Sequence, residues 1–167
     1  MNRLTGDESD TNSHIGDSEE FGPDDFPVAL ASLETAVLDA CAGEDEWPAQ
    51  VAAGICAGVD FAIANPVIAR SLTVTSALET GNTQRYERLI GRLAGFIQIR
   101  APAGARMPAS IEALVAGIVG LVGDHIRIGR VERLSELRAE LVLMTLLPYL
   151  GFAEAQRWAD GVAVSSL

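Results

Sequence analysis

Residues Leu141 to Phe152 read LVLMTLLPYLGF and contain no charged side chain. A helix on the surface of a soluble protein keeps one polar face, and this segment has none to offer. The segment is also too short to span a membrane, which takes roughly 20 apolar residues. Charged residues flank it on both sides, Glu140 before it and Glu154 after it. We therefore expect burial on two sides, against the chain's own core and against a partner.

The composition predicts one domain that follows an acidic tail. The chain has 167 residues, of which 49% are hydrophobic, so it is long enough and apolar enough for a single core. Residues 1–25 hold eight acidic residues and one arginine and show no apolar periodicity. This pattern predicts a disordered acidic tail. We expect an all-helical domain over residues 26–160 and a flexible C-terminus over residues 161–167.

Net charge and cysteine content limit the binding partners and the cellular location that we expect for the protein. The net charge of -11 argues against an electrostatic surface for nucleic acid, so we expect no direct contact with DNA or RNA. No apolar signal segment opens the chain, and Cys41 and Cys56 are its two cysteines. We therefore expect a cytoplasmic protein without a disulfide framework and without membrane attachment.

Apolar spacing predicts helices along the whole domain, which places the chain in the all-α class. The segment 67–77 is rich in β-branched residues, but no second strand pattern exists to pair with it, so a short helix is the better interpretation. Another helix starts near Pro48, after three acidic residues, and ends at Asn65-Pro66. The remaining predicted helices span residues 27–41, 83–99, 108–128, 135–149 and 152–160.

Two glycines interrupt the helix that begins near Pro48. Trp47, Val51 and Ile55 recur every four residues there, whereas Gly54 and Gly58 lie on a different strip. A glycine in a helix interior costs about 0.5–1 kcal/mol relative to alanine. We expect close packing of a neighbouring helix against these two positions.

The last two long helices carry more apolar surface than one small domain can cover. The 108–128 helix has a stripe of large apolar residues and a second stripe of small ones, and the 135–149 helix has two apolar stripes. Contiguous apolar patches of this kind mark interaction sites. Two helices from each chain would then form a four-helix interface between two copies, and a larger intramolecular core is the alternative. The expected interface residues are Ala113, Ala116, Gly117, Gly120, Leu137, Leu141, Met144 and Pro148.

No known catalytic or metal-binding motif is present in the sequence. There is no GxSxG, HExxH or GxxxxGK[ST] pattern and no Cys/His cluster with the spacing of metal ligands, so we expect no catalytic residue, metal or cofactor. A small helical enzyme remains an alternative, and it would need Asp60, Tyr86 and His125 to converge inside the bundle. His125 lies on an apolar stripe and is better interpreted as a hydrogen-bonded core histidine.

Four stretches of the sequence resemble the C-terminal regulatory domain of TetR-type transcriptional regulators. They read EDEWPAQVAAGICAGVDFAIANPVIARSL, QRYERLIGRLAGFI, MPASIEALVAGIVGLVGDHIRIGR and RLSELRAELVLMTLLPYLGFAEAQRWA. In order and spacing they cover roughly residues 28–159. The resemblance implies an all-helical domain that forms a homodimer through its last two long helices, which agrees with the argument from apolar stripes.

The resemblance also implies a pocket for a small, largely apolar effector among the central helices. Nothing carries over residue by residue, so the expected lining is chosen from positions that project inward from three helices. These side chains would equally fill a closed core. The expected pocket residues are Val59, Ile63, Tyr86, Ile90, Ile118, Val122 and His125.

One departure from the family pattern bears on function. Regulators of this type begin with a DNA-binding head that contains a helix-turn-helix, and residues 1–25 are acidic instead. We therefore expect an effector-sensing or dimerisation domain, able to pair with itself or with a full-length relative. A head encoded upstream of the given start is one alternative, and a purely structural dimer or a small helical enzyme is another.

Overall fold

Every element that the structure describes is a helix, which confirms the all-α prediction. The computed structural model describes residues 25–75, 83–99, 101 and 111–165. The first half of the chain forms α1 (Asp25–Ala42), α2 (Trp47–Ala64), α3 (Pro66–Arg70), the π-helix η1 (Ser71–Thr75) and α5 (Thr83–Ile99). The second half forms α6 (Ile111–Arg127), the 3-10 helix η2 (Val131–Leu137), α7 (Arg138–Leu150) and α8 (Phe152–Ser165).

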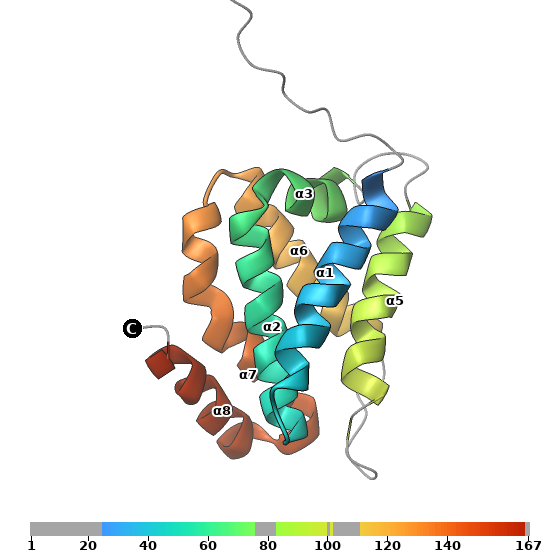
Figure 1. The fold of residues 1–167 in the computed structure, drawn as a ribbon. Coiled ribbons are helices and arrows are strands. Elements are labelled where there is room, and N and C mark those ends of the chain that lie inside the picture. The colour runs from blue at the N-terminus through green and yellow to red at the C-terminus, as the bar shows by residue number, and fades with distance from the viewer. Residues whose placement is uncertain (1–24, 76–82, 100, 102–110, 166–167) are drawn as a thin grey trace, which may run out of the picture.

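The long helices form an up-and-down bundle (Figure 1). α1 packs along α2, and α5 flanks α1 on its other side, with α6 behind them. α3 and η1 cross one end of the bundle, and α8 packs against α7 at the opposite end. α2 therefore lies at the centre, in contact with α1, α3, η2, α7 and α8.

Among the described residues, α2 is also the one helix long and apolar enough to cross a membrane by length and composition. The core helix of a soluble protein passes the same test. α2 contacts five other elements, and Val51, Ala52, Val59 and Ala62 are among its buried residues. Its apolar composition is thus explained by its central place in the bundle.

Local sequence determines where several helices begin and end. Glu46 precedes α2 in an extended conformation and Pro48 lies in its first turn, where a missing N–H costs nothing. At the far end of α6, the Gly129 N–H donates to the Ile126 carbonyl and the Arg130 N–H to the His125 carbonyl. This pair of hydrogen bonds is a Schellman motif, and Gly129 has the positive φ of 71° that the motif requires.

Most helix limits lie within a few residues of the predicted ones, with two differences. The predicted helix 135–149 is a 3-10 helix as far as Leu137 and becomes α-helical only at Arg138. α8 continues to Ser165, beyond the predicted end of the domain at residue 160. The predicted acidic tail lies outside the described residues, except for Asp25, which begins α1.

Candidate ligand cavity

A cavity of about 160 Å³, partly open to solvent, lies among α1, α2, η1, α5, α6 and α7. Large apolar side chains from each long helix form most of its wall. Examples are Val37 of α1, Ile55 of α2, Leu93 of α5, Val119 of α6 and Leu141 of α7. A cavity lined in this way favours an apolar occupant, and a cavity of about 150 Å³ with a similar lining can hold benzene.

The polar groups in the wall already have partners inside the protein. The Cys41 thiol donates to the Gln50 carbonyl, and the Gln50 side-chain amide donates to the Glu44 carbonyl. The hydroxyl of Thr73 donates to the Ala69 carbonyl and that of Thr145 to the Leu141 carbonyl. No charged residue is among those that line the cavity in the described part of the chain.

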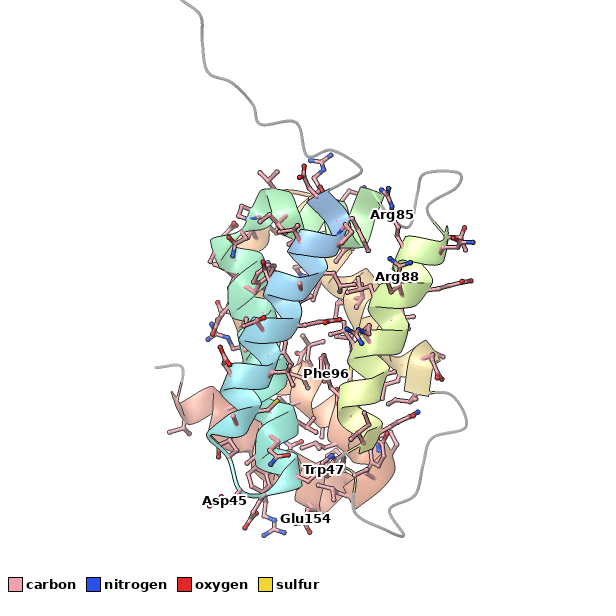
Figure 2. The ribbon with its side chains drawn as sticks, turned by 45° about the vertical axis from the view of Figure 1, so that its right-hand side comes forward. Asp45, Trp47, Arg85, Arg88, Phe96 and Glu154 are labelled. Carbon is pink, nitrogen blue, oxygen red and sulfur yellow. The ribbon has the colours of Figure 1, made fainter. Side chains whose placement is uncertain are left out.

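The aromatic residues Trp47, Phe61 and Phe96 line the cavity, and Figure 2 labels Trp47 and Phe96. Trp47 stands at the start of α2, and its indole N–H donates to the Ile97 carbonyl near the end of α5 at 3.2 Å. Tyr149 of α7 packs edge-on against Trp47, with ring centroids 5.0 Å apart. Phe96 reaches from α5 toward α1 in Figure 2. These contacts join α2, α5 and α7 around the cavity.

One ion pair links the two outer helices that flank the cavity. The Arg92 guanidinium of α5 donates to both carboxylate oxygens of Glu34 on α1, at 2.7 and 3.0 Å. Its side chain is largely exposed, so the pair contributes little to the free energy of folding.

The structure brings three of the seven expected pocket residues to the cavity. Val59, Ile118 and Val122 line it. Ile90 is buried in the main core cluster, and Ile63 packs against a smaller cluster that includes Val59 and Leu134. Tyr86 and His125 are half-buried and are not among the residues that line the cavity.

The expectation missed the contribution of α1 and of the aromatic residues. Leu33 and Val37 of α1 line the cavity, although only the central helices were considered for the pocket. Their periodic spacing in the sequence was a usable signal. Trp47 and Phe96 also line it, but nothing in their sequence context separates a cavity wall from a filled core.

The polar groups that an enzyme would need have separate partners. Asp60 accepts a hydrogen bond from Arg138 of α7, and the Tyr86 hydroxyl donates to the Ala116 carbonyl at 3.3 Å. His125 hydrogen-bonds through Nδ1 to the Leu121 carbonyl at 3.0 Å. Ala116 and His125 are nine residues apart, which is about 13 Å along a helix. The three side chains therefore do not form one constellation, and the described residues contain no cluster of metal-ligating groups.

The expected interface residues fall into three groups by exposure. Ala113, Gly117, Gly120 and Met144 are exposed, and Ala116, Leu137 and Pro148 are half-buried. Leu141 is 0% exposed and lines the cavity, so it belongs to the chain's own core. The buried side of α7 consists of Leu141, Val142, Thr145, Leu146 and Tyr149. The open side of α7 is therefore centred on Leu147, roughly opposite this group, and not on the stripe that was expected.

Comparison with known proteins identified no relative of the chain. No family model matches the chain, and neither a curated protein nor a solved structure is similar to it.

Proposed function

We propose that the chain is an effector-binding and dimerisation domain like the C-terminal regulatory domain of TetR-type regulators. The observation that carries the proposal is the apolar cavity of about 160 Å³ at the centre of the bundle. Protein interiors are normally packed without voids of this size, and such a void costs stability. A small apolar effector that fills the cavity explains why the fold keeps it.

The open faces of α6 and α7 support the dimerisation part of the proposal. Ala113, Gly117, Gly120 and Asp124 follow one another at intervals of four, three and four residues on the exposed side of α6. Glu140, Met144 and Leu147 follow one another at intervals of four and three residues on the exposed side of α7. This is the 3.5-residue repeat of helices that pack knobs into holes. Met144 and Leu147 are each 41% exposed, and a partner with small residues at this spacing would accommodate them.

A Cβ atom at Gly117 or Gly120 would meet nothing within 4 Å among the residues that the structure describes. Packing against those residues therefore does not require glycine at either position. Close approach of a helix from a second copy provides a reason for it. A two-fold dimer, in which each chain offers both helices, forms the four-helix interface. The same surface would serve a heterodimer with a related regulator.

Binding of a small neutral hydrocarbon tests the proposal directly. Toluene is a suitable probe, because it is apolar and close in size to a molecule that such a cavity holds. A ligand at a hundred times its Kd stabilises the folded state by about 2.7 kcal/mol, which raises Tm by on the order of 5–10 °C for a chain of this length. We expect a saturable rise in Tm with toluene. An unchanged Tm at saturating toluene would remove the support for an effector site.

A further inference from the structure

Gly54 and Gly58 lie one turn apart on α2 and both line the cavity, yet their surroundings differ. A Cβ atom built on Gly54 would lie 3.0 Å from the Cys41 sulfur and 3.3 Å from Val37 Cγ1. Gly54 is thus required where α1 packs closely on α2. A Cβ atom on Gly58 would meet no atom of the described residues within 4 Å.

Among the described helices, none approaches Gly58 closely enough to require a glycine there. It lies in the middle of an 18-residue helix, where glycine is unfavourable relative to alanine. Because it lines the cavity and its Cβ position is open, a side chain there would extend into space that a ligand could use. The missing side chain keeps this part of the cavity empty.

The wall also restricts the chemistry of the ligand. Neutral donors of Cys41, Thr73 and Thr145 are committed to backbone carbonyls, and no cationic residue is among the described lining. A carboxylate or phosphate placed against this apolar wall would lose much of its hydration without gaining a cationic partner, which is unfavourable. The same cost applies to an ammonium group.

We propose that Gly58 sets the size limit of the cavity and that the ligand is a neutral, hydrocarbon-like molecule without an ionised group. The inference rests on the proposed function, because it assumes that the cavity binds an effector. It adds the ligand's charge class and the residue that limits the ligand's size.

The test compares Gly58 with a glycine that lies away from the cavity. Gly91 is exposed on α5, is absent from the cavity wall, and also has open space at its Cβ position. Toluene affinity is measured by calorimetry for the wild-type chain and for Gly58→Ala, Gly58→Leu and Gly91→Leu. We expect Gly58→Leu to weaken toluene binding by at least about tenfold, a difference that calorimetry resolves. Gly58→Ala should weaken it less, and Gly91→Leu should leave it unchanged within about twofold.

The outcomes of these binding measurements distinguish a failure of the proposed effector site from a failure of the proposed role of Gly58. Toluene that fails to bind the wild-type chain contradicts the effector site itself. Equal toluene affinity in the wild-type chain and in a folded Gly58→Leu variant overturns the role of Gly58 and leaves the effector site standing. Benzoate has the same ring with a carboxylate, and benzoate binding as tight as that of toluene overturns the charge class. A cooperative thermal transition checks folding, and Gly58→Ala provides the comparison if Gly58→Leu does not fold.

Discussion

At the scale of single residues, the two cavity glycines should respond in opposite ways to the same substitution. Gly58→Ala places a methyl group in open space and should stabilise the fold by about 0.5–1 kcal/mol through helix propensity. Gly54→Ala places the methyl group against the Cys41 sulfur, and overpacking of this kind costs about 1–3 kcal/mol. Urea unfolding of both variants measures the difference, and a Gly54→Ala variant more stable than Gly58→Ala would contradict it.

A double-mutant cycle checks the cause of the Gly54 effect. If the Cys41 sulfur is the obstacle, Cys41→Ala should recover part of the loss in the Gly54→Ala background. Residues in contact show coupling energies of about 0.5–3 kcal/mol, whereas distant pairs are additive. Cys56→Ala serves as the control, because Cys56 does not appear among the atoms near the Gly54 Cβ position.

We expect the fold to lose stability at alkaline pH because burial raises the pKa of one thiol and two tyrosine hydroxyls. Burial raises the pKa of the Cys56 thiol, and the charge of Arg138 offsets part of that rise. Burial also raises the pKa of Tyr86 and of Tyr149. The unfolded chain loses these protons near pH 8.5 for cysteine and near pH 10 for tyrosine, before the folded chain does. The unfolded state then binds fewer protons, so stability is intact below about pH 8.5 and falls as the pH rises further.

Denaturant unfolding at a series of pH values between about 7 and 11 measures this decline. Cys56→Ala should remove the part of the decline that begins near pH 8.5, and Tyr86→Phe should reduce the part above pH 10. A free energy of unfolding that stays constant through this range would show that these groups titrate alike in both states.

At the scale of helices, the two glycines with positive φ should differ in what they tolerate. Gly129 ends α6 with φ 71°, in a Schellman motif, where asparagine is an accepted replacement. Gly151 joins α7 to α8 with φ 76° and ψ 169°, a region that is essentially restricted to glycine. We expect Gly129→Asn to cost less than about 1 kcal/mol and Gly151→Asn to cost about 1–3 kcal/mol. Thermal unfolding of the two variants compares them, and equal losses would contradict the assignment.

The helices were largely predictable from the sequence because each has its own local signals. The predicted limits of α5, residues 83–99, match the structure, and the Pro66 and Gly129 boundaries lie where expected. η2 escaped prediction because the spacing of Leu134 and Leu137 fits a 3-10 helix as well as an α-helix. The open side of α7 was misjudged for a related reason. Several apolar stripes surround α7, and only the packing of α2 and α8 against it determines which one is covered.

The cavity was less predictable than the helices. Val59, Ile118 and Val122 were identified from inward projection alone. Helices around an empty cavity and helices around a filled core show the same apolar periodicity in sequence. The sequence therefore does not distinguish Ile90, which is buried in the core, from Leu89, which lines the cavity. The proposed role of Gly58 likewise depends on the open space at its Cβ position, which the sequence does not reveal.

At the scale of the whole molecule, the expected dimer can be tested through the open side of α7. Leu147→Arg places a charge at the centre of that side and should convert a dimer at micromolar concentration into a monomer, because an unpaired charge is costly in an apolar interface. Val28→Arg is the matched control, since Val28 is an exposed apolar residue on α1. Sedimentation velocity measures the oligomeric state. A wild-type monomer, or a Leu147→Arg dimer as stable as the wild type, would contradict the proposed interface.

Leu141 and Thr145 contact the cavity from the same helix that presents Met144 and Leu147 on its open side. An effector and a second copy would therefore act on different sides of α7. If one changes the affinity for the other, thermodynamic linkage requires the reverse effect to have the same size. A sensing role for this domain would depend on that coupling.

The open position at Gly58 also has an evolutionary consequence. A single base change turns any glycine codon into an alanine codon or a valine codon. One mutation can therefore shrink the binding space by one methyl group, or by an isopropyl group, while the backbone and its hydrogen bonds stay as they are. If the cavity binds an effector as proposed, descendants of this gene could shift between larger and smaller effectors in single mutational steps.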